Sequence, residues 1–301
     1  PPVRAGILNA RNRLGDTMRA TIFGLVLSLA TAVATAQELD LNVHVDPQRR
    51  AYFGDLHLHT SNSLDATWAG VRTTPGDAYT YAQGLPVRYF GREVKRRAPL
   101  DFLAVSDHAE YMGVTRAMLD QNPDFEGTNW YESLTTGNRP GFDKLMGAVF
   151  RGAAPLPELN SEPRRRTTWS EVIRVANQFN RPGRFTAFVA FEWSDTPAGA
   201  HNHRVSIFRG PVYPELPFSA LDSRNPLDLW RYADANRAKG IDSVLIPHNS
   251  NLSNGLQFSY LGPDGQPMGR EYAQVKARNE TLVEVTQVKG TSETHPLLSP
   301  E

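Results

Sequence analysis

The sequence contains no cysteine among its 301 residues. This absence excludes disulfide bonds, thiolate zinc sites, cysteine nucleophiles and cysteine-bound lipid anchors. Any metal ion bound by this chain must therefore be held by histidine, aspartate and glutamate side chains. Imidazole and carboxylate ligands without thiolate suit Zn, Mn or Fe(II).

The sequence also lacks an excess of charge of either sign. Lys and Arg total 32, and Asp and Glu total 32, so the formal net charge is zero. Two short basic clusters, 95–97 and 164–166, are typical of a solvated surface. The balanced charge gives no indication of nucleic acid or an anionic membrane as a partner.

A long apolar run is missing too. The apolar segment 22–33 is shorter than the about 20 residues of a membrane span. It follows an arginine and ends in Ala-Thr-Ala, which predicts a signal peptide over 18–36, with a membrane anchor as the alternative. Residues 1–17 are then an upstream segment, and the mature domain, 37–301, is exported to the periplasm or secreted, with no stable membrane span after cleavage.

Short segments rich in β-branched and aromatic residues predict strands. These segments are 51–59, 100–108, 184–193, 203–210, 242–249 and 281–290. Helical patterns lie between them: Thr74-Pro75 begins one helix, a capping box at 168–171 a second, and Asn225-Pro226 a third. This alternation predicts a parallel α/β domain, in which 120–163 is a long insertion.

Polar side chains end four of the predicted strands. They are His57 and His59 on the first strand, Asp107-His108 on the second, Glu192 on the third and His248 on a later one. The carboxyl ends of parallel barrel strands meet at one face, where active sites are built. A single histidine at a strand end is unremarkable, but four such strands in a chain with eight histidines favour a shared metal site.

Two histidine pairs have the H-x-H spacing. Residues i and i+2 of a regular strand point to one face, so His57 and His59 can reach the same ion. In "AHNHR", His203 enters a predicted strand and is the preferred ligand. His201 is either a loop histidine near the site or a catalytic residue.

These motifs together resemble the PHP (polymerase and histidinol phosphatase) superfamily. "GDLHLHT" is similar to its first motif, "AVSDHAE" to its second, "FEW" to its bridging glutamate and "IPHN" to its third. The segments "HRVSIFRG" and "VEVTQVKGTSETHP" are more specifically similar to the DUF3604 branch. The resemblance covers roughly residues 48–301 and implies a distorted (β/α)7 barrel of the TIM-like type.

The resemblance also implies two or three divalent ions (Zn, Mn or Fe). The implied ligands are His57 and His59 for the first ion, His203 and His248 for the second, Asp65 and His108 for the third, and Glu192 as a bridge between the first two. The superfamily's last motif is a D-x-H, and none follows His248. We therefore expect a chain truncated at its C-terminus, with an incomplete barrel and an under-ligated third position.

The predicted chemistry is that of an exported metal-dependent hydrolase. Divalent ions lower the pKa of a coordinated water and offset charge on phosphoryl oxygens, so we expect a phosphoesterase acting on a phosphorylated small molecule. Two alternatives stay open. One is hydrolysis of a non-phosphate ester or an amide, and the other is a non-catalytic, metal-stabilised extracytoplasmic binding domain.

Further candidates lie beside the ligands. Arg204 follows His203 and is either a phosphate-binding residue or a surface arginine on its strand. With Glu192 and His201, it completes the set of catalytic candidates. The candidates for substrate binding are Asn249, Lys289 and Glu293.

Overall fold

The computed structural model describes residues 50–126, 159–262 and 265–293, together with Gln48, Gly147, Leu156 and Leu297. The predicted upstream segment and signal peptide, and most of the predicted insertion at 120–163, lie outside the described residues. No helix of the described part is long and apolar enough to cross a membrane. The chain divides into two compact units, Pro1–Ala51 and Tyr52–Glu301, and every element below belongs to the second.

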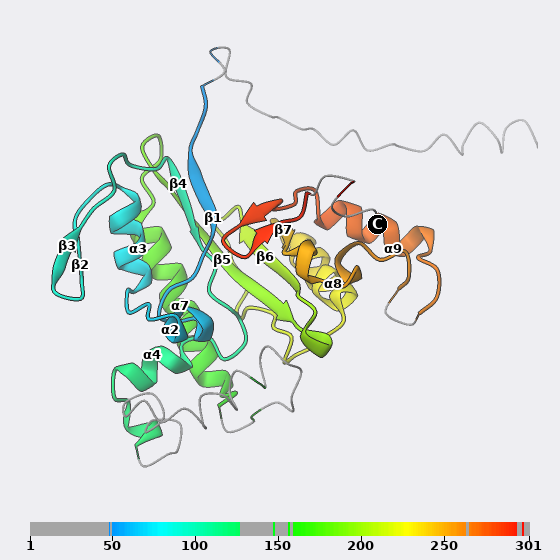
Figure 1. Ribbon diagram of the computed structural model, residues 1–301, viewed down its shortest axis with the longest axis horizontal. Coiled ribbons are helices and arrows are strands. Elements are labelled where there is room, and N and C mark those ends of the chain that lie inside the picture. The colour runs from blue at the N-terminus through cyan, green and yellow to red at the C-terminus, as the bar shows by residue number, and fades with distance from the viewer. Residues whose placement is uncertain are drawn as a thin grey trace, which may run out of the picture. The chain divides into compact units, whose positions relative to one another are not determined.

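The main sheet of the second unit is curled and has five strands (Figure 1). In spatial order its strands are β1 (Gly54–Leu58), β4 (Phe102–Val105), β5 (Thr186–Asp195), β6 (Asn202–Phe208) and β7 (Ser243–His248). β4 pairs in parallel with both β1 and β5, whereas β6 is antiparallel to both β5 and β7. Four strands therefore run in one direction and β6 opposes them.

This topology shows that the expected (β/α)7 barrel was wrong. Such a barrel needs a closed sheet of parallel strands, and the described residues form a half-barrel sheet of mixed direction. The link between β5 and β6 explains the difference. It spans only 196–201, and a parallel crossover needs about a dozen residues or more, so β6 returns beside β5 in the opposite direction.

The described α-helices are α2 (Leu64–Trp68), α3 (Pro75–Ala82), α4 (Val114–Leu119), α7 (Glu162–Phe179), α8 (Pro226–Arg237) and α9 (Arg270–Asn279). α3 and α8 begin where the sequence predicts, at a Thr74–Asp77 capping box and at Asn225, whose side chain accepts from the Leu227 N–H. α7 begins earlier than predicted, with a proline in its first turn, so the motif at 168–171 lies inside the helix.

Short elements complete the described part. Two antiparallel hairpins are formed by β2 (Val87–Tyr89) with β3 (Arg92–Val94), and by β8 (Thr286–Gln287) with β9 (Gly290–Thr291). The 3-10 turns are η1 (Pro123–Phe125), η2 (Pro197–Gly199), η3 (Ser250–Leu252) and η4 (Leu256–Phe258). The predicted strand at 281–290 is therefore irregular chain at 281–285 followed by the β8–β9 hairpin, with the Glu284 N–H bonded to the Pro247 carbonyl of β7 at 3.0 Å.

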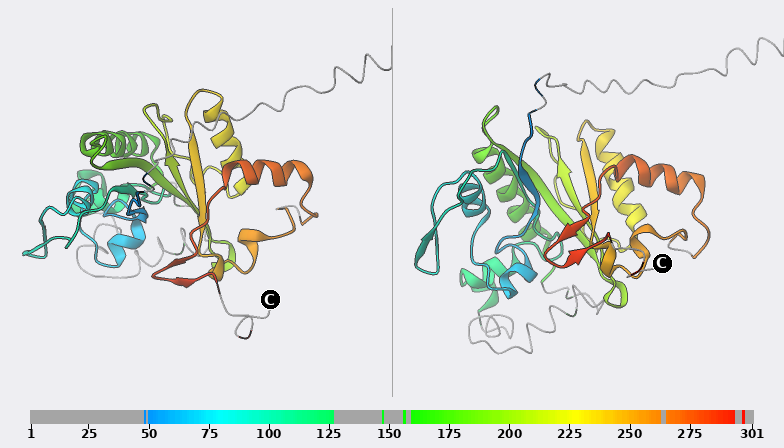
Figure 2. Two further views of the ribbon diagram at one scale, coloured as in Figure 1. Left: turned by 90° about the horizontal axis from the view of Figure 1, so that it is seen from above. Right: turned by 45° about the horizontal axis from the view of Figure 1, so that its top comes forward.

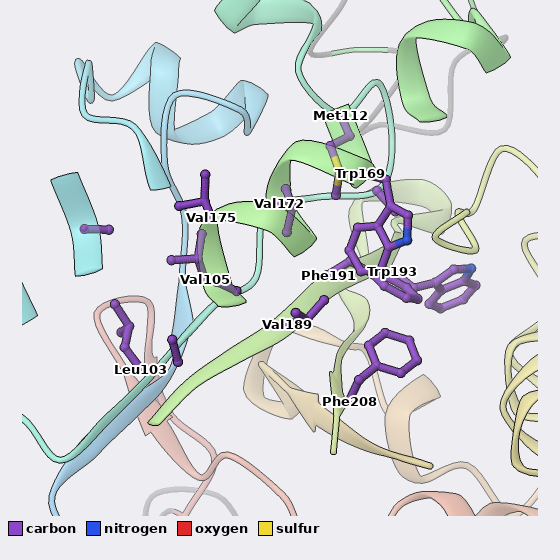
Figure 3. Close-up of a cluster of buried hydrophobic side chains, with 14 of the residues drawn as sticks. Leu103, Val105, Met112, Trp169, Val172, Val175, Val189, Phe191, Trp193 and Phe208 are labelled. Carbon is purple, nitrogen blue, oxygen red and sulfur yellow. The ribbon is translucent and has the colours of Figure 1, made fainter. Parts of the chain in front are cut away.

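The main core lies between the sheet and its covering helices. In Figure 3, Trp169 and Val172 of α7 face Val189, Phe191 and Trp193 of β5. Because side chains alternate across a strand, the intervening β5 residues point to the other face, where Ala190 packs in a smaller apolar cluster. Figure 2 shows α7 along one side of the sheet and the red β8–β9 hairpin on the other.

Candidate metal centre

The strand directions bring polar side chains to one edge of the sheet. β1, β4, β5 and β7 run the same way, so their carboxyl ends lie at this edge. β6 runs the opposite way, so its first residues lie there too. His203 near the start of β6 is consequently paired in register with His248 at the end of β7. All seven ligands implied by the family resemblance lie at this edge.

Glu192 lies at the centre of the cluster and is 1% exposed. Its Oε2 lies 2.9 Å from His57 Nε2 and 2.7 Å from His59 Nε2. Its Oε1 lies 2.9 Å from His203 Nδ1 and 3.2 Å from His248 Nε2. A carboxylate whose two oxygens each face a pair of imidazoles has the arrangement of a ligand that bridges two ions.

Asp65 and His108 lie next to this centre. His59 Nδ1 is 3.1 Å from Asp65 Oδ1, and His108 Nε2 is 3.5 Å from Asp65 Oδ2. His59 therefore faces Glu192 with one nitrogen and Asp65 with the other. These contacts join the third implied position to the first.

Glu284 belongs to the cluster and was missed by the sequence interpretation. Its Oε2 lies 2.6 Å from His57 Nδ1, and it forms a ligand group with His57 and His248. The sequence places this residue inside a predicted strand rather than at a strand end. The available signal was a carboxylate directly after the apolar pair Leu282-Val283. Its position depends on the tertiary contact with β7, which no local pattern reveals.

The side chains present fit a divalent cation. Four groups of three offer ligand atoms within 4.8 Å of one another: His57, His248 and Glu284; His57, His59 and Glu192; His59, Asp65 and His108; and Glu192, His203 and His248. The groups share members, so they form one cluster. The buried Nδ1 of His248 has no hydrogen-bond partner among the described residues, and the nitrogen and oxygen donors suit Zn, Mn or Fe(II).

The carboxylates of the cluster are held in their ionised form. Burial alone would raise the pKa of Glu192, but His108, His248 and His59 keep that pKa well below its usual range. The pKa of Asp65 is also well below its usual range, because His59 and His108 outweigh the effect of burial. Ionised carboxylates are the form that binds a metal ion.

The histidines divide into two sets. Burial lowers the pKa of His203 to about 3 and also lowers the pKa of His248, which keeps both rings neutral. Burial acts in the same direction on His57 and His59, but Glu192 with Glu284 or Asp65 outweighs it and raises both pKa values. A raised pKa favours the protonated ring, whose charge offsets that of the carboxylates, and a bound cation offers the same compensation.

Two polar residues hold ligands in place. The Ser194 hydroxyl donates to Glu192 Oε1 at 2.7 Å and lies 2.6 Å from His108 Nδ1. Asp107, which precedes a ligand in sequence, accepts from the Thr60 N–H at 2.6 Å and from the Ser63 hydroxyl at 2.8 Å. Asp107 therefore orders the loop that leads to Asp65.

Arg204 does not join the cluster, and its buried side chain fits neither alternative given for it, a phosphate-binding residue or a surface arginine. Neighbouring residues on a strand point to opposite faces, so the Arg204 side chain lies across the sheet from that of His203. Its guanidinium is 1% exposed, and Nε donates to Glu280 Oε1 at 2.8 Å. Gln257 links this network to the ligand, because its Nε2 donates to the His203 carbonyl at 2.9 Å.

The other candidate residues, His201, Asn249 and Glu293, differ in their contacts with the cluster. The His201 ring stacks on His203 with centroids 4.8 Å apart. Asn249 is buried and accepts from Gln287 Nε2 at 3.2 Å. Glu293 is exposed and belongs to none of the ligand groups of the described part.

A cavity of about 680 Å³ opens beside the cluster. The ligands His57, His59, Asp65 and Glu284 form part of its lining, and Lys289 contributes a cation. Its remaining lining includes the apolar side chains Leu56, Val205, Ile246, Leu282, Val283 and Val288. The volume is in the range of small-molecule sites.

Fold and cluster together define an α/β protein with a buried histidine–carboxylate centre that could hold metal ions. The chain matches the DUF3604 family, described as a protein of unknown function, over residues 46–301. It therefore belongs to the DUF3604 family, as the sequence motifs predicted. Comparison with curated proteins and with solved structures gives no match.

Proposed function

We propose that this chain is an exported metal-dependent hydrolase that cleaves phosphate esters of small molecules. The observation that carries the proposal is the position of Glu192. Its two buried oxygens each face a pair of histidines, beside a cavity large enough for a substrate. Buried charges of this density need a compensating partner, and a pair of divalent ions provides one.

The proposed ligands follow the contacts. His57 and His59 would hold one ion with Glu192, and His203 and His248 would hold a second. Asp65, His59 and His108 form the group for a third, and Glu284 would give the ion at His57 a further carboxylate. Such ions, Zn, Mn or Fe(II), lower the pKa of water and offset the charge of a phosphoryl group.

The chain's own residues orient the substrate in this proposal. Lys289 lines the cavity and would bind a phosphate oxygen as a point charge. Burial, with a smaller contribution from the charge of Lys289, lowers the pKa of His201, whose ring stacks on that of His203 with centroids 4.8 Å apart. His201 is therefore the proposed proton carrier at the edge of the centre, and Gln287, held by Asn249, the proposed neutral donor.

The motif resemblance supports the same assignment. PHP-type enzymes use an H-x-H pair and a bridging glutamate, which correspond here to His57, His59 and Glu192. Membership of that superfamily, and export through the signal peptide at 18–36, form part of the proposal.

The test is made on the full chain. Metal content is measured by elemental analysis, and phosphomonoesters and phosphodiesters are assayed with added Mn or Zn. We expect bound metal and turnover, both lost in Glu192→Gln. The matched control is Glu171→Gln, a half-exposed carboxylate on α7 paired with Arg174 outside the ligand groups.

Each negative outcome of these assays would contradict a different part of the proposal. Turnover of carboxylic esters or amides alone would overturn the phosphate assignment and keep the hydrolase. Bound metal without turnover of any ester would leave the same ligands as a structural centre in a binding domain. Full activity of Glu192→Gln would contradict the proposed role of Glu192 as a metal ligand, and with it the proposed hydrolase.

A further inference from the structure

The β2–β3 hairpin projects from the side of the second unit in the views of Figure 1 and Figure 2. Its strands pair from Val87 with Val94 to Tyr89 with Arg92, so the turn between them consists of two residues, 90 and 91. Phe90 in this turn is 71% exposed. The hairpin therefore presents a large apolar side chain to solvent at its tip.

The backbone at the tip is unfavourable for phenylalanine. The φ angle is 46° at Phe90 and 76° at Gly91, so both turn residues lie in the left-handed region. Two-residue hairpin turns of this kind prefer Asn-Gly or Asp-Gly, because a bulky side chain tolerates a positive φ poorly. The exposed ring gains little burial in return. Backbone strain that packing does not explain is a frequent sign of function.

The hairpin and the residues directly after it carry four exposed cations: Arg88, Arg92, Lys95 and Arg97. No ion pair of the described residues includes any of them, and Glu93 is the only carboxylate between 87 and 97. The formal net charge of the whole chain is zero. Positive charge therefore gathers at the hairpin, over a larger surface than the basic cluster 95–97 alone.

Two carboxylates lie on the inner side of the hairpin. Asp55 and Asp77 line a cavity between the hairpin and α3, together with Arg96. Asp77 accepts from the Thr74 N–H at 2.8 Å within the capping box of α3, and Asp55 accepts from the His57 N–H at 3.0 Å. Both carboxylates are engaged behind the hairpin, so its exposed side keeps its positive charge.

We propose that the β2–β3 hairpin docks this protein on an anionic phospholipid bilayer, with Phe90 inserted below the headgroups and Arg88 and Arg92 at the lipid phosphates. A strand rises about 3.3 Å per residue, so the tip lies about 7 Å beyond the two arginines. Segments that bind in the bilayer interface bury their apolar side by about 5–10 Å. Lysine and arginine near an anionic lipid surface add electrostatic attraction.

The exposed tip favours a bilayer over a soluble polyanion. An anionic polysaccharide would pair with the cations but leave Phe90 in water. Single-stranded nucleic acid is typically bound in a positively charged groove with several stacking rings, whereas this hairpin offers one strongly exposed ring at a projecting tip. A bilayer provides a phosphate layer and an apolar interior together. This docking does not depend on the proposed hydrolase.

The test measures co-sedimentation of the full chain with vesicles of phosphatidylcholine, alone or mixed with an equal part of phosphatidylglycerol. We expect stronger binding to the anionic vesicles. We also expect weaker binding at about 1 M salt than at about 0.1 M, because the Debye length falls from about 10 Å to about 3 Å.

Phe90→Asn is the main variant, because it creates a preferred turn sequence and keeps the hairpin. We expect it to weaken partitioning into the anionic vesicles by about tenfold or more, through the lost apolar contact, without lowering the melting temperature. The matched control is Tyr260→Asn, at an aromatic residue that is 90% exposed outside the hairpin, and it should partition like the wild type.

The charges are tested by Arg88→Gln combined with Arg92→Gln. Each cation near an anionic lipid surface contributes about fivefold in partitioning, so the pair should cost about 20-fold or more. The control combines Arg231→Gln with Arg270→Gln, two exposed arginines of α8 and α9, which lie apart from the hairpin in Figure 1. It removes the same net charge and should have a much smaller effect.

Insertion of the tip is tested directly by Phe90→Trp. We expect this variant to gain tryptophan quenching by brominated acyl chains relative to the wild type. No gain of quenching, or equal partitioning of Phe90→Asn and the wild type, would overturn the proposal. Binding to heparin or single-stranded DNA without binding to vesicles would assign the hairpin to a soluble polyanion and would also overturn it.

Discussion

Ser194 lies between two proposed metal ligands, Glu192 and His108, and fixes the orientation of the His108 ring. Its hydroxyl donates to Glu192 Oε1, so it accepts from His108 Nδ1, and His108 Nε2 is left facing Asp65. Partners of this kind orient metal-ligating imidazoles and raise their basicity.

We therefore expect Ser194→Ala to reduce metal affinity by about 10–100-fold. Competition with a chromophoric chelator measures this change. Ser170→Ala is the control, because Ser170 is exposed on α7 and its hydroxyl bonds only to the Arg166 carbonyl among the contacts described. Equal affinities for the two variants would contradict the role given to Ser194.

The Arg204–Glu280 pair is the most buried ion pair of the described residues that lacks a histidine, with side chains 1% and 3% exposed. Glu280 also accepts from Trp230 Nε1 at 2.8 Å. Removing one partner leaves a buried charge without compensation, so Glu280→Ala is expected to lower the free energy of unfolding by about 3–5 kcal/mol.

Urea unfolding monitored by circular dichroism measures this loss. The comparison variant is Glu171→Ala, which breaks the exposed Glu171–Arg174 pair and is expected to cost about 0–1 kcal/mol. Similar costs for the two variants would show that the Arg204 network contributes little to folding.

The sequence could predict single ligand residues where they lie at the end of a predicted strand. His57, His59, His108, Glu192 and His248 follow apolar runs, and the fold brings them together. Arg204 could not be placed, because adjacency to His203 in sequence means the opposite face of a strand. Glu284 was missed because its contacts are made across the fold, and Ser194 because its contact with His108 is.

At the scale of elements, strand positions were easier to predict than strand directions. A continuous apolar run such as that of β5 reads the same whether its neighbour is parallel or antiparallel. The length of 196–201 was the decisive information, since it is too short for a helical crossover. The sheet therefore keeps five of the six predicted strands, without 281–290, and departs from the barrel.

β1 shows how closely two neighbouring strands approach. A Cβ added at Gly54 would overlap the ring of Phe102 on β4. We expect Gly54→Ala to destabilise the protein by about 1–3 kcal/mol, because the ring must move within a packed sheet. Thermal unfolding measures the change.

Gly76→Ala is the control for this prediction. It lies in α3, and its nearest neighbours would be 3.7 Å from the new Cβ, an ordinary contact. Alanine is favoured over glycine within a helix by up to about 1 kcal/mol, so this variant should be neutral or stabilising. A neutral Gly54→Ala would contradict the close packing of β1 on β4.

At the scale of the whole molecule, the cluster joins segments that are far apart in the chain. Its members range from His57 to Glu284. Most lie on the strands of the sheet or just after them, whereas Asp65 lies in α2 and Glu284 lies between α9 and β8. A ligand that binds only the folded state stabilises it by mass action.

Added Mn or Zn should therefore raise the melting temperature. The expected gain is about 2.7 kcal/mol at a free ion concentration of about 100 times Kd. Scanning calorimetry with and without a chelator measures it, and Glu192→Gln should show no metal-dependent shift. An equal rise in the melting temperature of Glu192→Gln would show that the stabilising ion binds at another site.

The backbone hydrogen bonds around Glu284 affect how fast a metal ion bound there would exchange. Outside the β8–β9 pairing, the described backbone bonds of this stretch are those of the Glu284 N–H to Pro247 at 3.0 Å and of the Ser292 N–H to the Val285 carbonyl at 2.7 Å. His203 and Glu192, in contrast, belong to paired strands. Segments with few bonds open without global unfolding. We therefore expect the ion proposed at His57, with Glu284 as its further carboxylate, to enter and leave faster than the ion proposed at His203 and His248, and the Glu284 amide to exchange its hydrogen on the same timescale.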